Sequence, residues 1–157
     1  GFKTIGFDVQ KEKVNMVNAG HNYIGDVVDA ELADLVKKGM LTATTDFSFV
    51  KDVDFIAICV PTPLDAHQQP DISYVRDSTI AISKHLRRGS MVVLESTTYP
   101  GTTEELIRPI LEEGSGLKCG EDFTWVSPRS GWIRATSSIR PATPPRLWVP
   151  SVLTPRR

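Results

Sequence analysis

Hydroxyl side chains are concentrated in one segment of the chain, directly after an apolar run. Between positions 95 and 103 the sequence holds the carboxylate Glu95 and six hydroxyl residues: Ser96, Thr97, Thr98, Tyr99, Thr102 and Thr103. The apolar run 91–94 predicts a buried strand before this segment, and the stretch 101–113 predicts a helix after it. Helix N-termini attract anions, and capping would use only part of so many hydroxyls. The segment is therefore a candidate ligand site.

A single acid, Asp8, follows the strand predicted at 4–7. An acid at this place in a dinucleotide-binding fold accepts hydrogen bonds from the two hydroxyls of a ribose. Asp8 would equally serve as the N-cap of a helix that begins at Lys11. Both interpretations stay open, because the sequence contains no glycine-rich phosphate motif.

A further hydroxyl, that of Thr62, stands between two prolines after the apolar run 55–60. Pro61 and Pro63 stiffen the loop, which would keep the Thr62 side chain aimed at the crevice beyond the strand end. A plain rigid turn explains the same pattern equally well.

The elements that would position these side chains alternate along the chain. Strands are predicted at 4–7, 55–60 and 91–94, and helices at 11–18, 30–38, 72–86 and 101–113. The two later strands are continuous apolar runs, as expected of strands buried on both faces. This order predicts an α/β fold, a Rossmann-like parallel sheet with flanking helices, with ligands bound at the carboxyl ends of its strands.

Length and composition predict an ordinary globular domain. The chain has 157 residues, 40% of them hydrophobic and 24% charged, which suits about one domain. No apolar run reaches the roughly 18 residues of a transmembrane helix. Two cysteines, Cys59 and Cys119, form no CxxC pair or Cys/His cluster, so we expect neither a zinc site nor a disulfide framework. A reducing compartment is the default.

The charge is divided between two parts of the chain. Residues 1–123 hold 12 basic and 19 acidic residues, a net charge of −7, whereas residues 124–157 hold six Arg and no acid. The second part also contains all three Trp and six of the eleven Pro. We therefore divide the chain into a domain at 1–123 and a tail at 124–157, whose composition predicts disorder.

Four segments of the first part together resemble the UDP-glucose/GDP-mannose dehydrogenase family, and most of all its UDP-N-acetylhexosamine 6-dehydrogenase branch. They are Gly6-Phe7-Asp8 with Lys13-Val14, the ICVPTPL string at 58–64, the QPDISYV string at 69–75, and the VLESTTYPGTTEE string at 93–105. The second and fourth strings are long enough to be specific. The resemblance runs through residues 1–123 without a break.

The resemblance implies a cofactor, a substrate and a set of site residues. NAD would be bound with Asp8 on the adenosine ribose, Lys13 beside it, Thr62 against the cofactor and Thr97 near the nicotinamide and the reacting sugar carbon. Thr97 is thereby the one candidate catalytic residue, and no metal is expected. The implied substrate is a UDP-sugar, oxidised twice at C6 for surface polysaccharide synthesis. The resemblance also implies a cytoplasmic enzyme that forms homo-oligomers, with no membrane contact.

Three departures from the family limit what this chain is expected to do alone. The family's first strand and glycine-rich turn would lie upstream of Gly1, and the domain that supplies its catalytic Lys, Asn and Cys is absent. Neither cysteine of this chain matches that nucleophile. The family's Ser-Pro-Glu-Arg segment reads Ser-Pro-Arg-Ser at 127–130. We therefore expect an incomplete domain, a fragment without activity of its own.

Codon arithmetic offers an origin for the tail. If one nucleotide is lost after Phe123, each original codon spans two present codons; Trp125-Val126 then requires a Gly, and Trp132-Ile133 an Asp. With permitted codons the shifted frame restores the family's continuation, including the missing Glu. A basic arm that binds nucleic acid is the rival interpretation, but it explains only the composition, so a nucleic-acid partner is not expected. A disordered Pro-rich linker remains compatible with either.

Overall fold

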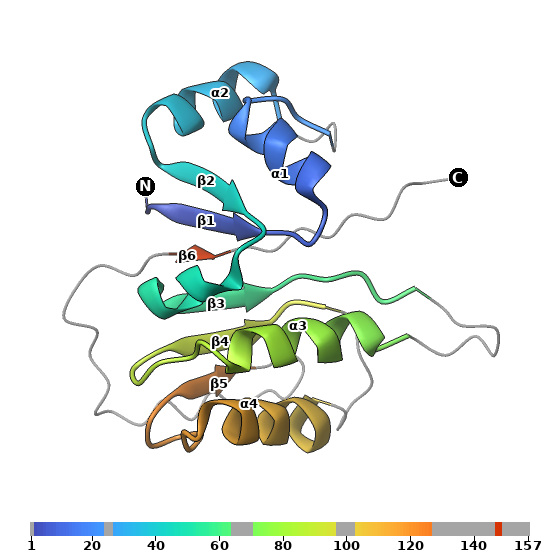
Figure 1. The fold of residues 1–157 in the computed structure, drawn as a ribbon, viewed down its shortest axis with the longest axis vertical. Coiled ribbons are helices and arrows are strands. Elements are labelled where there is room, and N and C mark those ends of the chain that lie inside the picture. The colour runs from blue at the N-terminus through green and yellow to red at the C-terminus, as the bar shows by residue number, and fades with distance from the viewer. Residues whose placement is uncertain (1, 24–26, 64–70, 97–102, 127–146, 149–157) are drawn as a thin grey trace.

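The computed structural model describes residues 2–23, 27–63, 71–96, 103–126 and 147–148 (Figure 1). In chain order, its elements are β1 (Thr4–Phe7), α1 (Lys11–Asn18), α2 (Asp29–Lys37), β2 (Leu41–Thr44), the 3-10 helix η1 (Phe47–Asp52), β3 (Phe55–Ile58), α3 (Ser73–Ser83), β4 (Met91–Leu94), the π-helical turn η2 (Thr103–Ile107), α4 (Arg108–Ser115), β5 (Thr124–Val126) and β6 (Leu147–Trp148). Among the described helices none combines the length and apolar character that a bilayer crossing requires.

The strands form one parallel sheet in the order β2-β1-β6-β3-β4-β5. Figure 1 shows their arrowheads on the same side of the molecule, so the strands' carboxyl ends share one edge. The usual doubly wound order of a dinucleotide-binding sheet is 3-2-1-4-5-6. By that order, the place of strand one belongs here to β6, which pairs with only Thr4-Ile5 of β1 and Phe55-Ile56 of β3. The centre of the sheet is its shortest paired region.

The hydrophobic core lies mainly between β3, β4 and the helices α3 and α4. Its fully buried members include Ile56 and Ile58 of β3, Val92 and Leu94 of β4, and Ile82 of α3. Within β1 and β2 only Phe7 is fully buried, and α2 has no buried residue. The half of the sheet that carries β1 and β2 is thus the more loosely packed half.

The strand β2 pairs with β1 on one side, and on its outer edge a side chain takes the place of a further strand. The Asn18 amide at the end of α1 donates to the Ala43 carbonyl oxygen at 2.8 Å and accepts from the Ala43 N–H at 2.8 Å. This pair satisfies both backbone groups of Ala43 and anchors the C-terminal end of α1 on the sheet.

Most predicted elements are confirmed, with shifted ends. The strands at 4–7 and 91–94 and the helix at 11–18 have the predicted bounds, whereas the strand predicted at 55–60 ends at Ile58. The helix predicted at 101–113 is described only from Thr103, and it runs as a π-helical turn before α4 begins at Arg108. Pro109 has no N–H to continue a regular helical ladder through this point. The short strand β2 and the turn η1 were not predicted.

Two pieces of the tail are strands. The first, β5, pairs with β4 and includes Trp125-Val126, so the tail is ordered at its start, where its composition predicts disorder. The second, β6, was not predicted. The rest of the tail, and with it the prediction of disorder, lies outside the described residues.

Candidate functional site

Three of the candidate segments meet at the carboxyl edge of the sheet. Asp8 follows β1, the Pro-Thr-Pro loop follows β3, and Glu95-Ser96 follows β4. The Ser96 hydroxyl donates to the Val60 carbonyl oxygen at 2.7 Å, and the Glu95 N–H donates to the Ile58 carbonyl oxygen at 2.9 Å. These bonds join the ends of β3 and β4. They thereby fix where the loop that carries Thr62 leaves the sheet.

Asp8 uses its two carboxylate oxygens differently. Its side chain is buried, with the residue 7% exposed. One oxygen, Oδ1, accepts from the Gln10 N–H at 2.8 Å, and this bond shapes the turn into α1. The other, Oδ2, is fully buried and has no hydrogen-bond partner in the described part of the chain. An unpaired buried carboxylate oxygen is costly unless a ligand supplies a donor.

Support of the start of α1, the other role considered for Asp8, uses only one of its two carboxylate oxygens. The residue before α1 is Gln10, whose side chain makes no capping bond. Asp8 binds the Gln10 N–H rather than an N–H of the first helical turn. Stabilising the approach to α1 occupies Oδ1 and leaves Oδ2 for a donor such as a ribose hydroxyl.

Lys13 lies near Asp8, on the wall of the same cavity. The cavity holds about 300 Å³ and is lined by Asp8, Lys13 and Tyr23 together with apolar side chains of α1, α2 and β2. The Lys13 ammonium lies 5.7 Å from the centre of the Tyr23 ring, within the range of a cation–π contact. Neither Asn22 nor Tyr23, which also border this cavity, was singled out from the sequence.

Thr62 and Thr97 are not brought into this cavity by the described residues. Thr62 is half-buried in its loop and does not line the cavity around Asp8, although both lie at the carboxyl edge of the sheet. Thr97, the candidate catalytic residue, falls outside the described residues. The structure therefore groups Asp8 with Lys13 and places Thr62 apart from them.

Cys59 has the electrostatics of a structural thiol. It follows β3 and is partly buried. Burial, reinforced by the nearby Glu95 carboxylate, raises the pKa of the Cys59 thiol to about 11. The thiolate is the reactive form of cysteine, and with this pKa Cys59 stays protonated near neutral pH.

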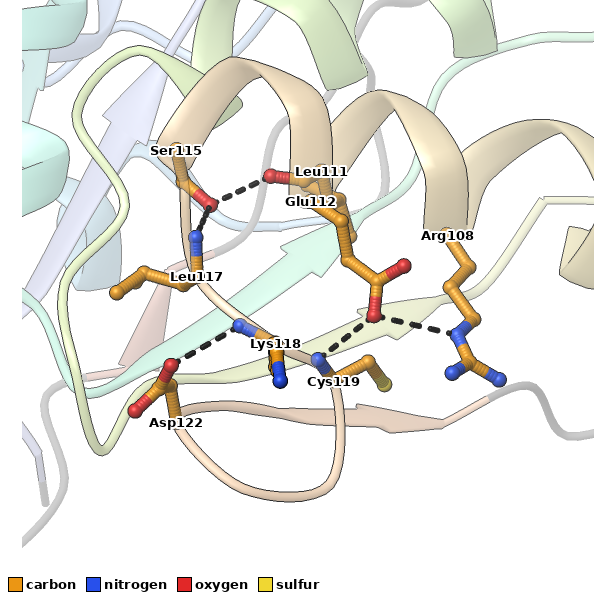
Figure 2. A network of polar contacts seen from close by, with 8 residues as sticks. All are labelled: Arg108, Leu111, Glu112, Ser115, Leu117, Lys118, Cys119 and Asp122. Carbon is orange, nitrogen blue, oxygen red and sulfur yellow. Dashed lines mark hydrogen bonds and ion pairs between the residues drawn. The ribbon is translucent and has the colours of Figure 1, made fainter.

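Cys119 belongs to a polar network that holds the chain ahead of β5 (Figure 2). The Glu112 carboxylate of α4 accepts from the Cys119 N–H at 2.9 Å and from the Arg108 side chain at 3.4 Å. Asp122 accepts from the Lys118 N–H at 3.0 Å and pairs with Arg88 at 3.3 Å. These contacts hold the segment between α4 and β5 in place, so the network has a structural role at this edge of the sheet. No group of three or more His, Cys, Asp or Glu in the described ranges is arranged to hold a metal ion.

Comparison with known families identifies the fold. The pattern of the UDP-glucose/GDP-mannose dehydrogenase family, NAD binding domain, matches residues 1–128. The chain belongs to this family. Its parallel sheet with flanking helices is that of a Rossmann-like domain.

Several known proteins are similar to this chain. It is 36% identical to protein CapL of Staphylococcus aureus over 77% of this chain and 28% of that protein. It is 34% identical to the UDP-N-acetyl-D-glucosamine 6-dehydrogenase of Pseudomonas aeruginosa over 76% of this chain and 28% of that protein. It is 32% identical to the GDP-mannose 6-dehydrogenase of Pseudomonas putida over 95% of this chain and 35% of that protein.

Solved structures of the family share the fold. The ternary complex of GDP-mannose dehydrogenase from Pseudomonas aeruginosa matches with a TM-score of 0.76 and 32% identity, over 81% of this chain and 30% of that one. An NDP-N-acetyl-D-galactosaminuronic acid dehydrogenase from Methanosarcina mazei matches with a TM-score of 0.73 and 36% identity, over 80% of this chain and 28% of that one. The chain spans about a third or less of the relatives that it matches.

Proposed function

We propose that this chain is the NAD-binding part of a nucleotide-sugar 6-dehydrogenase. The reaction would oxidise C6 of a UDP-sugar, UDP-N-acetylglucosamine or -mannosamine or UDP-glucose, to the uronic acid for surface polysaccharide synthesis. The names of the similar proteins support the reaction class, and the match to the family's NAD-binding domain supports the cofactor. We place it in the cytoplasm, where NAD and activated sugars are made, and as part of a homo-oligomer.

The observation that carries the proposal is the unpaired Oδ2 atom of Asp8. It is a buried acceptor at the carboxyl end of β1, the place at which this fold binds the hydroxyls of an adenosine ribose. Because Oδ1 is held by the Gln10 N–H, the carboxylate keeps one orientation before any ligand arrives. An acceptor that is already oriented loses less conformational freedom on binding.

Each candidate residue has a distinct task in this proposal. Bound NAD would accept the hydride from the sugar. Asp8 would hold the ribose of the adenosine, Lys13 would add positive charge beside it, and the rigid loop of Thr62 would contact the cofactor. Thr97 is proposed to lie near the nicotinamide and the reacting carbon. The chain alone lacks the family's catalytic cysteine, so we expect it to bind but not to turn over.

A second candidate is a Rossmann-like binding fragment that never forms part of an active enzyme. The two-residue strand β6 favours it, because the central place of the sheet is normally the place of a full strand. Assaying the chain with NAD and UDP-N-acetylglucosamine does not separate the two candidates, since both predict silence. NAD binding that depends on Asp8 does separate them, because a fragment outside any active enzyme has no reason to keep that contact.

The test is a titration of the isotope-labelled chain with NAD, followed by NMR chemical shifts. We expect weak, roughly millimolar binding, because the sequence contains no glycine-rich turn whose backbone N–H groups would hold the pyrophosphate. Asp8→Ala should reduce the affinity about tenfold, as expected when a hydrogen bond to a charged group is lost. Asp77→Ala, an exposed acid on α3, is the matched control and should change nothing. Absence of binding, or equal effects of the two substitutions, would refute the proposal.

A further inference from the structure

Tyr23 lies beside the proposed ribose site, on the turn that follows α1. The turn leaves α1 at Gly20, which has a φ of 76°, a conformation that glycine adopts without strain. A Cβ atom there would lie 2.8 Å from Ala33 of α2. The His21 N–H donates to the Met16 carbonyl oxygen at 2.9 Å, and the Asn22 N–H donates to the Asp29 carboxylate at 2.9 Å. Tyr23 is thus presented from a turn anchored to both α1 and α2.

Lys13 is fixed from the other side. It lies in the first turn of α1, two residues after the helix begins. The approach to that helix is set by the bond from the Gln10 N–H to Asp8 Oδ1. The register of α1 therefore ties the backbone of Lys13 to the carboxylate of Asp8. What this register leaves open is the position of the lysine's long side chain, which has several rotatable bonds.

The Tyr23 ring restricts that side chain. The Lys13 ammonium lies 5.7 Å from the ring centre, and Lys13 is half-buried rather than extended into solvent. Both residues line the cavity that Asp8 also borders. Apolar side chains also line the cavity, among them Val14 and Val17 of α1 and Leu41 of β2. A cation held beside apolar side chains attracts an anionic ligand more strongly than one that moves freely in water.

We propose that Tyr23 is a positioning residue for the cofactor's adenosine end, acting through Lys13. The ring holds the ammonium group beside Asp8, so that a carboxylate acceptor and a cation face the same ligand. The ligand class is an adenosine diphosphate derivative, whose ribose offers hydroxyls and whose phosphates carry negative charge. This inference rests on the function proposed above and adds a residue that the sequence motifs do not include.

The test uses ADP-ribose as the probe and a double-mutant cycle as the readout. Tyr23→Leu should weaken ADP-ribose binding about threefold, the effect of losing one exposed cation–π contact. Tyr23→Phe keeps the ring and should bind like the unchanged chain. In a Lys13→Met background, Tyr23→Leu should cause no further loss, because its effect passes through the ammonium. Nicotinamide mononucleotide, which lacks adenosine, should respond to none of these substitutions.

A measurement on the unchanged chain guards against a variant that fails to fold. The Lys13 side-chain protons next to the ammonium should show an upfield NMR shift from the Tyr23 ring. Absence of that shift would overturn the inference, as would equal losses from Tyr23→Leu in both backgrounds, or an equal loss from Tyr23→Phe. If the unchanged chain binds no ADP-ribose, or Asp8→Ala leaves binding intact, the proposed function itself is refuted.

Discussion

The Ser96 hydroxyl bonds to the Val60 carbonyl oxygen at 2.7 Å, although the two residues are 36 positions apart. The bond crosses from the end of β4 to the start of the loop after β3. Its consequence is that two of the candidate segments move as one unit. Of the hydroxyls that follow β4, Ser96 is accounted for by this structural bond, which leaves Thr97 and its neighbours as the candidates for ligand contact.

We predict that Ser96→Ala loosens the Pro-Thr-Pro loop. Loss of this hydrogen bond leaves the Val60 carbonyl oxygen short of a partner, which costs about 1 kcal/mol. The midpoint of thermal unfolding should fall by about 3 °C. Ser78→Ala on α3 is the matched control, since the Ser78 hydroxyl makes no hydrogen bond within the described residues, and its midpoint should stay within about 1 °C of the original. An equal fall for both variants would show that the bond contributes nothing particular.

Gly114→Ala should destabilise the packing of α3 against α4. A Cβ atom at Gly114 would lie 2.0 Å from Ser83 Oγ and 2.6 Å from Ser83 Cβ, closer than atoms can approach without movement. We expect a loss of about 1–3 kcal/mol in the free energy of unfolding, typical of an overpacked contact. The check is urea unfolding of a double-mutant cycle: Ser83→Gly should cost less in the Gly114→Ala chain than in the original. Additive effects would contradict the clash.

The Cys59 thiol should be slow to react near neutral pH. With its pKa raised to about 11 by burial and by Glu95, very little thiolate exists at pH 7, and reactivity should rise steadily as the pH approaches 11. The measurement is the rate of iodoacetamide modification of a Cys119→Ser chain between pH 7 and 10, with Cys59→Ser as the companion variant. A rate that levels off near pH 8.5, as for an ordinary thiol, would contradict the assignment.

Acid should weaken the start of α3. The N–H of Ser73 donates to Asp71 Oδ1 at 2.9 Å, and this backbone hydrogen bond is the main reason that the pKa of Asp71 lies below its usual value. A lowered pKa in the folded state means that the stabilisation is present above the ordinary pKa of the free acid and is lost as the pH falls through the lower, folded-state value.

For Asp71→Asn we therefore expect a smaller loss of stability between pH 5 and pH 2 than for the original chain, measured by urea unfolding at each pH. Asp77→Asn on α3 is the control, because Asp77 is exposed and pairs with its neighbour Arg76. The same acid dependence in all three chains would show that Asp71 does not contribute to it.

Sequence patterns predicted the elements that bury continuous apolar runs. The MVVL run of β4 and the spacing of Val75, Thr79 and Ile82 in α3 leave little choice of structure, and all three of these helical positions are buried. The strand β2 was missed because its residues, Leu-Thr-Ala-Thr, are only partly buried, and its edge is satisfied by the Asn18 side chain. No local sequence pattern predicts the hydrogen bonds between Asn18 and Ala43, which lie 25 positions apart.

The sequence predicted Asp8 as a site residue, but not Tyr23, which lies near it in the structure. Asp8 stands out as an acid after an apolar strand, and the structure adds that only one of its oxygens is used locally. Tyr23 carries no signal of its own, since its approach to Lys13 depends on the turn at Gly20 and on the packing of α2. Residues that become neighbours only through a turn leave no regular spacing in the sequence.

If Asp8 recognises the ribose hydroxyls of an adenosine nucleotide, removing one of those hydroxyls should weaken binding through Asp8 alone. The measurement compares ADP-ribose with its analogue that lacks the 2′-hydroxyl of the adenosine, on the unchanged chain and on Asp8→Ala. We expect the unchanged chain to prefer ADP-ribose by about tenfold, the usual effect of one hydrogen bond to a charged group, and Asp8→Ala to bind the two ligands equally. Equal binding by the unchanged chain, or a preference that survives in Asp8→Ala, would contradict it.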